Sequence, residues 1–324
     1  MKPFAYERAE DVRSAVSAAA APGARYLGGG TNLVDLMRLG VETPDRLVDV
    51  SRLAHDGIEP LDGDRLRIGA AVRNTDLAND PVVRERYPVL SAALLAGASG
   101  QLRNLATVGG NLLQRTRCPY FQDVSKPCNK RRPGSGCPAR HGDHRNLAIL
   151  GHSEQCIATH PSDMAVALAA IGADVRVRGA AGERTVPIPG LHRLPGDHPE
   201  RDTVLEHGEL IVAVELAPPP PGRSAYRKVR DRAEFSFAVV SLAAVLDVAD
   251  GTVRDARLAF GGVAHAPWRA TRAEDALRGA PATVERFTAA ADAELSRAHP
   301  LRENRFKVPL ARNLLVTTLQ ELSA

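Results

Sequence analysis

Four cysteines that lie close together in the chain are the residues best suited to chemistry. They are all the cysteines that the 324 residues contain, and they occur at Cys118, Cys128, Cys137 and Cys156. The surrounding stretch is rich in Pro, Gly, Lys and Arg and shows no helix or strand periodicity. Four thiols gathered in an otherwise irregular loop suggest one shared task, and the task that best suits four thiolates is to hold a metal centre.

Three kinds of site compete for these thiols. Two disulfides are the plainest alternative, but disulfides are uncommon in chains without features of secretion. A structural zinc site usually contains two cysteines separated by about two to four residues, and no two of these cysteines are so close. A four-thiolate iron–sulfur cluster tolerates wider spacings because the cluster is large. Spacing alone therefore favours an iron–sulfur cluster over zinc by a modest margin.

Basic residues surround the cysteines and would offset the negative charge of a four-thiolate cluster, with only Asp123 and Asp143 opposing them. A solvated loop or a nucleic-acid patch would also be basic. However, Tyr120 and Phe121 are too few aromatic residues for a base-stacking platform. The basic side chains are Arg115, Arg117, Lys126, Lys130, Arg131, Arg132, Arg140 and Arg145.

Two glycine-rich turns carry the second clue, and they occupy residues 28–32 and 107–111. Glycine lets backbone N–H groups approach an anion, so a Cβ at Gly29 is expected to fill the space of a bound pyrophosphate. The first turn is not a phosphate loop, and Leu33 stands where Gly-x-Gly-x-x-Gly has its third glycine. A plain tight turn explains either turn alone. Two such turns from separate lobes could clamp one pyrophosphate.

Bulk composition is that of an ordinary globular chain, with 44% hydrophobic and 25% charged residues. The net charge of +4 and the pI of about 9.0 do not by themselves indicate nucleic-acid binding. No apolar run of about 18 residues predicts a membrane span, and the first residues lack the pattern of an export signal. The 10 histidines, which include His141, His144, His152 and His160, are scattered, and we expect surface or structural roles for them.

Periodicity and turn residues predict an α+β chain in two parts, separated by a proline-rich linker at residues 218–222. Helices are expected at residues 11–21, 33–39, 82–98, 162–171, 271–277, 283–295 and 310–322. Strands are expected at residues 25–27, 47–50, 65–72, 147–150, 175–177, 210–216, 226–230, 237–247 and 253–260. The last three strands are expected to form an antiparallel meander.

Three segments resemble the flavoprotein subunits of the xanthine dehydrogenase family: residues 25–33, residues 103–111 and the Phe-Gly-Gly-Val-Ala…Pro-Trp-Arg segment at 260–269. The resemblance covers essentially the whole chain. The cysteine insertion resembles that of the FAD subunit of trimeric periplasmic aldehyde oxidoreductases, which carries an additional [4Fe-4S] cluster there. The FAD subunit of 4-hydroxybenzoyl-CoA reductase also carries a cluster, but its local motifs are less similar.

The resemblance implies a two-lobed FAD-binding domain of the PCMH type, followed by a C-terminal α+β domain like that of carbon monoxide dehydrogenase flavoproteins. The expected domains are residues 1–222 and 223–324. The first divides into lobes at 1–54 and 55–222, with the iron–sulfur insertion at about 114–157. The FAD is expected between the two lobes.

The resemblance also implies roles for single residues. Asp163 would approach the flavin or its ribityl hydroxyls, although an acid favoured by a helix N-terminus is an equal explanation. Lys228 would bring a cation to the polar edge of the flavin, although an exposed strand lysine is the simpler explanation. Cys118, Cys128, Cys137 and Cys156 would ligate the cluster, and no catalytic residue is expected. The remaining FAD contacts are expected from Arg25, Tyr26, Leu27, Gly28, Gly29, Gly30, Thr31, Asn32, Leu33, Thr107, Gly109, Gly110 and Asn111.

The function implied is that of the electron-transfer subunit of a molybdenum-containing aldehyde oxidoreductase. A large partner subunit would oxidise aldehydes to carboxylic acids at a molybdenum cofactor. Electrons would pass through the [2Fe-2S] clusters of a small subunit to the FAD of this chain and then to an external acceptor. The heterotrimer would be periplasmic, by co-export with a signal-bearing partner, or cytoplasmic, with neither nucleic acid nor membrane as partner. The alternatives are the FAD and [4Fe-4S] subunit of a related molybdenum hydroxylase or hydroxybenzoyl-CoA reductase and, more remotely, a zinc-loop interaction protein.

Overall fold

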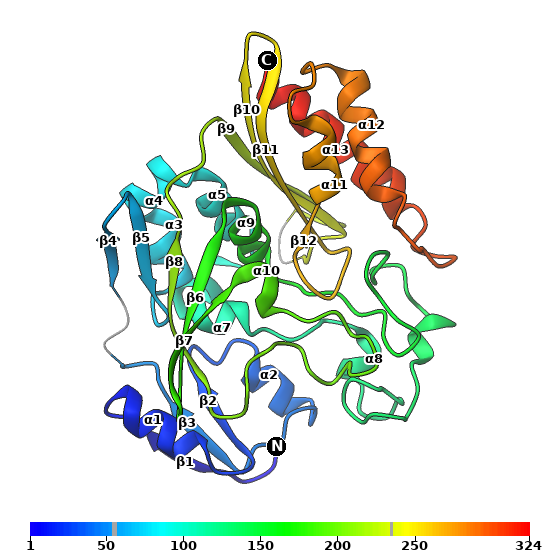
Figure 1. Ribbon diagram of the computed structural model, residues 1–324. Coiled ribbons are helices and arrows are strands. Elements are labelled where there is room, and N and C mark those ends of the chain that lie inside the picture. The colour runs from blue at the N-terminus through cyan, green and yellow to red at the C-terminus, as the bar shows by residue number, and fades with distance from the viewer. Residues whose placement is uncertain (54–56, 234–235) are drawn as a thin grey trace.

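Three β-sheets with helices packed around them make up the fold, as the computed structural model shows (Figure 1). The structure describes residues 1–53, 57–233 and 236–324, so the expected junction between the lobes at residues 54 and 55 lies outside the described residues. The mixture of helices and largely antiparallel sheets confirms the α+β class. In the described part of the chain, no helix is long and apolar enough to cross a membrane.

The first lobe is a small unit of three parallel strands in the order β1-β3-β2. Parallel strands need crossover connections, which helices α1 and α2 supply. Helix α1 begins at Asp11, whose carboxylate accepts a hydrogen bond of 2.7 Å from the backbone N–H of Ser14. Helix α2 begins directly after the first glycine turn. The elements are β1 (Ala5–Arg8), α1 (Val12–Ala19), β2 (Ala24–Leu27), α2 (Leu33–Arg38) and β3 (Arg46–Asp49).

The second lobe is built on an antiparallel sheet of order β4-β5-β8-β6-β7. Its helices share one apolar core with this sheet; every residue of helix α9 is buried, and residues 164–171 belong to that core. Ser162 caps α9, as predicted, by accepting a hydrogen bond of 2.9 Å from the backbone of Ala165. The elements are β4 (Ile58–Leu61), β5 (Arg65–Gly69), α3 (Asn74–Asn79), α4 (Pro81–Arg86), α5 (Pro88–Ala96), α6 (Gly100–Leu105), α7 (Val108–Leu112), α9 (Asp163–Ile171), β6 (Ala173–Gly179), β7 (Gly182–Pro187), α10 (Ile188–Leu191) and β8 (Leu210–Leu216).

One predicted helix is two helices in the structure. The stretch at 82–98 divides between α4 and α5 at Tyr87, which has φ −132° and lies outside the helical region. The cause is Pro88, because its ring restricts the residue before it and its nitrogen has no hydrogen to donate. Helix α5 then starts at Pro88, since the first position of a helix needs no such donor.

The cysteine insertion between α7 and α9 is mostly irregular but has its own apolar core. It contains one short helix, α8 (Pro119–Gln122), and one 3₁₀ turn, η1 (Pro138–Arg140). The strand expected at residues 147–150 is wrong. The backbone of Ile149 and Leu150 instead donates hydrogen bonds of 2.9 and 3.0 Å to the carbonyl of Val263. These residues were apolar because they are buried against the C-terminal domain, and burial does not distinguish strands from buried loops.

The C-terminal domain is an antiparallel sheet of order β12-β11-β10-β9 covered by three helices (Figure 1). The predicted meander and the three predicted helices are confirmed, with shifted ends. The elements are β9 (Arg223–Val229), β10 (Val240–Ala249), β11 (Thr252–Gly261), β12 (Trp268–Arg269), α11 (Thr271–Leu277), α12 (Val284–Leu295) and α13 (Lys307–Ser323).

A buried lysine at the start of α13 ties the insertion to this domain. Lys307 is 0% exposed. Its ammonium group donates hydrogen bonds of 3.0 Å to the carbonyl of Leu147 and 2.8 Å to that of Gly262. Because Leu147 belongs to the insertion and Gly262 follows β11, one side chain joins two segments that are distant in the sequence.

We expect Lys307→Met to lower the free energy of unfolding by about 1–3 kcal/mol near pH 9, because two buried carbonyls lose their donor. Burial lowers the pKa of Lys307 from 10.5 to about 7. Between these values the unfolded state binds the proton and the folded state does not, so the contribution of Lys307 to stability rises with pH. Denaturant titrations should therefore show a larger difference between wild type and variant near pH 9 than near pH 6. Equal differences would contradict this, and Lys126→Met, at an exposed lysine, is the control.

Candidate functional site

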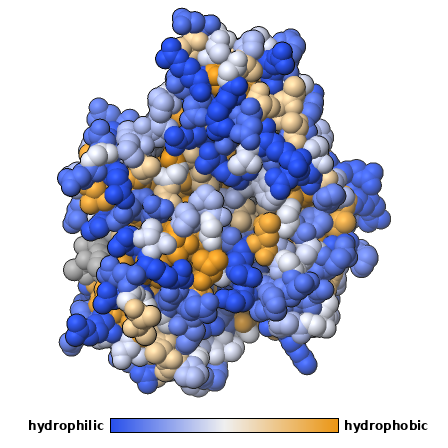
Figure 2. Space-filling view, viewed as in Figure 1, coloured by the Kyte–Doolittle hydropathy of each residue, from blue (hydrophilic) through white to orange (hydrophobic). Residues whose placement is uncertain are grey.

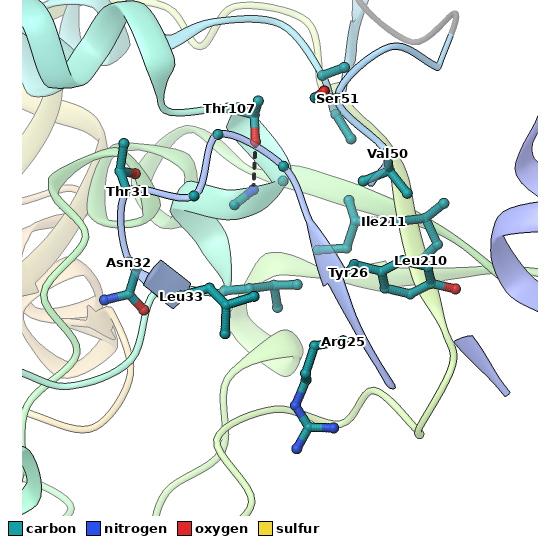
Figure 3. Close-up of a pocket in the computed structure, with 18 of the residues that line it drawn as sticks. Arg25, Tyr26, Thr31, Asn32, Leu33, Val50, Ser51, Thr107, Leu210 and Ile211 are labelled. Carbon is teal, nitrogen blue, oxygen red and sulfur yellow. Dashed lines mark hydrogen bonds between the residues drawn. The ribbon is translucent and has the colours of Figure 1, made fainter. Parts of the chain in front are cut away.

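The two glycine turns lie together on one cavity of about 290 Å³ (Figure 3). The first turn joins β2 to α2 in the first lobe, and the second begins α7 in the second lobe. Of the residues predicted to bind FAD, four lie outside the lining: Leu27, Asn111, Asp163 and Lys228. Those that line the cavity are Arg25, Tyr26, Gly28, Gly29, Gly30, Thr31, Asn32, Leu33, Thr107, Gly109 and Gly110.

The turns pack against each other through glycine backbone. A Cβ on Gly29 would collide with the backbone carbonyl of Leu105 and press on Ala106. The sequence-based reason for this glycine, room for a pyrophosphate, is therefore corrected: the nearest obstacle is the backbone directly before the second turn. By contrast, a Cβ on Gly110 would have only the Oγ1 of Thr107, at 2.9 Å, within 4 Å. That hydroxyl already caps α7 by accepting a hydrogen bond from the N–H of Gly110.

Several donors of the first turn have no partner. Within the described part of the chain, the backbone N–H groups of Gly29, Gly30 and Thr31 make no hydrogen bond. The buried Nδ2 of Asn32 also has no partner, whereas its Oδ1 accepts a hydrogen bond of 2.9 Å from the backbone of Arg115. Unpaired donors that converge on a cavity are suited to bind an anionic group such as a phosphate.

The other side of the cavity is apolar. Val50, Leu210 and Ile211 gather there, with the ring of Tyr26 beside Leu210 (Figure 3). The hydroxyl of Tyr26 donates a hydrogen bond of 2.7 Å to the carbonyl of Gly208, and burial raises its pKa. Figure 2 shows apolar residues near the middle of the face of the molecule that is viewed in Figure 1, surrounded by hydrophilic residues. Donors on one side and apolar groups on the other suit a nucleotide.

A chain of ion pairs runs from this cavity to the cysteine insertion. Glu42 lies 3.7 Å from Arg25 and 2.6 Å from Arg115. Arg115 also lies 2.6 Å from Asp202, which forms a second ion pair with the buried Lys130. Burial alone would raise the pKa of Asp202, but Lys130 and Arg115 hold it well below its usual range. The first cavity and the cysteine loop are therefore connected by one network of ion pairs.

Asp163 and Lys228 lie against each other in the interior. The Lys228 ammonium is 2.8 Å from Oδ2 of Asp163, and the hydroxyl of Tyr226 donates to Oδ1 at 2.5 Å. Lys228 also donates a hydrogen bond of 3.0 Å to the carbonyl of Ala96. Its side chain is 4% exposed, so the simpler explanation, an exposed strand lysine, is wrong. Burial and the charge of Asp163 raise the pKa of Tyr226 well above its ordinary value.

A second cavity, of about 390 Å³, lies between the insertion and the C-terminal sheet. Ser162 and Asp163 line it, together with Arg117 and Phe237, whose ring lies 4.9 Å from the Arg117 guanidinium carbon. Ser162 donates a hydrogen bond of 2.5 Å to Oδ1 of Asn111. Since Asn111 ends the second glycine turn, this hydrogen bond connects that turn to a residue of the second cavity.

The four cysteines line one small cavity inside the insertion. None forms a disulfide; Cys118, Cys128 and Cys156 are buried and Cys137 is partly exposed. Burial raises the pKa of Cys118 to about 11. The space between the thiols is about 10 Å³. No group of three or more His, Cys, Asp or Glu side chains among the described residues could hold a metal ion. The four predicted ligands therefore line one cavity, but their side chains are not arranged to coordinate a single metal ion.

Polar side chains hold the cysteine loop in shape. Asn129 donates a hydrogen bond of 3.0 Å to the carbonyl of Gln155 and accepts one of 2.6 Å from the backbone N–H of Gly136. The backbone N–H of Cys128 donates to the hydroxyl of Ser135 at 3.0 Å. The segments that carry the cysteines are therefore crosslinked to each other before any metal is considered.

The basic residues of the insertion are less free than the sequence suggested. Besides Arg115 and Lys130, Arg117 pairs with Asp35 at 3.8 Å and Arg140 with Glu154 at 2.7 Å. The sequence pattern indicated only two opposing acids. Glu42, Asp202 and Asp35 lie on other parts of the chain and approach the basic residues only in the folded protein. Much of the expected positive charge is therefore balanced by acids.

A histidine that sequence analysis missed contacts the cysteine site. His265 is 8% exposed, and its Nε2 lies 3.2 Å from Sγ of Cys156. Nearby, the rings of His160 and His192 have centroids 4.1 Å apart, and Nε2 of His192 lies 2.8 Å from the carbonyl of Leu112. The sequence contained one signal for His265: this residue lies within residues 260–269, the C-terminal segment that resembles flavoprotein subunits.

Two family models match the chain. The FAD binding domain in molybdopterin dehydrogenase matches residues 2–219, and the CO dehydrogenase flavoprotein C-terminal domain matches residues 224–322. Among curated proteins, the aldehyde oxidoreductase FAD-binding subunit PaoB of Escherichia coli K12 is 52% identical, over 100% of this chain and 99% of its own length. The xanthine dehydrogenase FAD-binding subunit of Escherichia coli O157:H7 is 27% identical, over 91% of this chain and 86% of its own length.

A solved structure shows the same fold. A chain of the carbon monoxide dehydrogenase of Hydrogenophaga pseudoflava, in a form that lacks the Mo-pyranopterin moiety of its cofactor, superimposes with a TM-score of 0.77. The two chains are 26% identical, and the match covers 99% of this chain and 98% of the other. The expected FAD-binding fold with a C-terminal flavoprotein domain is confirmed. The chain therefore belongs to the xanthine dehydrogenase and carbon monoxide dehydrogenase family, as one of its FAD-binding medium subunits.

Proposed function

We propose that this chain is the FAD- and [4Fe-4S]-binding electron-transfer subunit of a molybdenum-containing aldehyde oxidoreductase. The observation that carries the proposal is the 52% identity with the aldehyde oxidoreductase subunit PaoB over the full chain. Identity with a xanthine dehydrogenase subunit is much lower, at 27%. Oxidation of the aldehyde to a carboxylic acid then belongs to a partner subunit, and the residues of this chain bind and position redox groups.

The first cavity fits the dinucleotide part of FAD. Its unpaired N–H groups at Gly29, Gly30 and Thr31 would bind the pyrophosphate, and the apolar side at Leu210 and Ile211 would cover the nucleoside. The glycine contact between the two turns keeps these donors at a fixed distance from α7. In this proposal the chain excludes water from the phosphates by enclosing them between two lobes.

The second cavity fits the flavin end. Asp163 lines it, and Ser162, which also lines it, donates a hydrogen bond to Asn111 of the second glycine turn. Lys228 and Tyr226 each bind one oxygen of Asp163, which fixes the carboxylate in place. We therefore propose that Asp163 contacts the flavin or its ribityl chain directly and that Lys228 acts through Asp163. This differs from the role first expected for Lys228, a cation facing the flavin edge.

The cysteine cavity fits a thiolate-ligated cluster by its donor set. Four thiols, none of them in a disulfide, line one space, and an iron–sulfur cluster accepts four thiolates at wide sequence spacing. Cys118, Cys128, Cys137 and Cys156 would be the ligands.

When bound, FAD and the cluster would supply electron transfer, with the flavin able to exchange one or two electrons and the cluster one. The residues of the chain supply positions and charges. Asp202, Arg115 and Glu42 link the two sites through ion pairs, and Lys130 and Arg115 hold the pKa of Asp202 well below its usual range. The irregular insertion is held by the C-terminal domain through Lys307 and the Val263 carbonyl.

The partners proposed are a large molybdenum-cofactor subunit, a small [2Fe-2S] subunit and an external electron acceptor. Relatives named as FAD-binding subunits or medium chains support a complex of several subunits. We further propose that the heterotrimer is periplasmic through a signal carried by a partner, and that the domains divide at residues 222 and 223. Neither a nucleic acid nor a membrane is proposed as a partner.

Metal and flavin analysis tests the proposal directly. Complex purified anaerobically should contain, per copy of this chain, about four irons and four acid-labile sulfides at its own cluster, beyond those of the small subunit, and about one FAD. Cys118→Ser should lose the iron of this chain and keep FAD, because the two sites are separate cavities. A complex that contains zinc and no additional sulfide would contradict the proposed cluster of this chain. A complex without flavin would contradict the proposed FAD site.

We expect Gly110→Ala to weaken FAD binding by about tenfold, equivalent to about 1.4 kcal/mol. Gly110 lines the cavity, and its new methyl group would lie 2.9 Å from Oγ1 of Thr107, so the hydroxyl that caps α7 would have to move at the edge of the proposed site. Titration of apoprotein with FAD, followed by flavin fluorescence, measures the change.

The matched control is Gly100→Ala, where a Cβ meets nothing within 4 Å. It should bind FAD as wild type does. Equal affinity of wild type and Gly110→Ala would show that this turn does not bind the dinucleotide.

A further inference from the structure

His265 is held firmly beside one cysteine. Its Nε2 lies 3.2 Å from Sγ of Cys156, and the two residues are 8% and 5% exposed. The residues before it are anchored to the insertion, because the carbonyl of Val263 accepts hydrogen bonds from two backbone groups there and that of Ala264 accepts one of 2.9 Å from His160. The contact therefore follows from the packing of the C-terminal domain on the insertion.

His265 also lines a small cavity of about 20 Å³, together with His160 and His192. Within the described residues, Nδ1 of all three histidines has no hydrogen-bond partner. The space is large enough for one water molecule. A water that donates to Nδ1 of His265 would leave the hydrogen on Nε2, where it points to the sulfur.

We propose that His265 is a positioning residue that donates a hydrogen bond from Nε2 to the sulfur of Cys156 and raises the reduction potential of the cluster bound there. This rests on the proposed function, since it needs the cluster. An N–H···S hydrogen bond withdraws electron density from a ligating sulfur and stabilises the reduced, more negative state. Among the described side chains, His265 is the one with a nitrogen bonded to a cysteine sulfur.

In this proposal the C-terminal domain contributes a residue to the cluster site. All four cysteines belong to the insertion, whereas His265 follows β11. A movement of the C-terminal domain relative to the insertion would change the hydrogen bond to Cys156, and with it the potential of the cluster.

The test is a redox titration of the intact complex followed by electron paramagnetic resonance. His265→Leu, which removes the donor, should shift the cluster potential to a more negative value at unchanged iron and sulfide content. His265→Gln, whose amide nitrogen reaches as far as Nε2, should restore most of the wild-type value. A His265→Leu cluster with wild-type potential would overturn the inference.

The matched control is His144→Gln. His144 is also buried between the insertion and the C-terminal domain, where it bonds to Ala139 and Glu303, but the structure gives it no sulfur contact. This variant should leave the potential unchanged. A shift as large as that of His265→Leu would assign the effect to loosened packing and refute the hydrogen bond.

A second measurement needs no variant and covers the case in which His265→Leu loses its cluster. Pulsed electron paramagnetic resonance on wild-type complex with ¹⁵N-labelled histidine should detect coupling between the reduced cluster and one histidine nitrogen. Lack of coupling in a complex with full iron content would reject the role of His265. Wild-type complex without additional iron and sulfide would instead reject the proposed cluster itself.

Discussion

The contact between the two glycine turns is the constraint on which the site depends. The first turn approaches the second so closely that no side chain fits at Gly29, where a Cβ would collide with the carbonyl of Leu105. This contact joins two lobes that have separate sheets. It also leaves the N–H groups of the first turn facing the cavity. The same glycine therefore lets the two lobes pack closely and keeps an N–H group without a protein partner among the described residues.

Interior charges extend from this contact in two directions. Toward the C-terminal sheet, Asp163 is fixed by Tyr226 and Lys228 at the edge of the second cavity. Toward the insertion, Glu42, Arg115 and Asp202 form a continuous chain of ion pairs. Burying charged groups is unfavourable unless they are paired, so each pair fixes the relative position of two elements. The proposed flavin and cluster sites are thereby held in fixed positions relative to each other.

The insertion shows how an irregular segment becomes ordered without regular secondary structure. Its backbone N–H groups at Ile149 and Leu150 bond to Val263, its Leu147 carbonyl accepts from Lys307, and its own side chains, such as Asn129, close the loop. The C-terminal domain is therefore part of the cysteine site. That dependence is the reason that His265 reaches Cys156.

The sequence by itself determined the α+β class, most helices and strands, the two turns and the four gathered thiols, because these follow from local periodicity, glycine and cysteine spacing. It failed at residues 82–98 and 147–150, where a proline and burial against another domain decided the structure. Only the tertiary structure decided that Lys228 pairs with Asp163, that acids from other elements balance the basic loop, and that His265 lies beside Cys156. The physical reason is that these contacts join residues far apart in the chain, and their energies depend on distances that exist only after the domains have packed together.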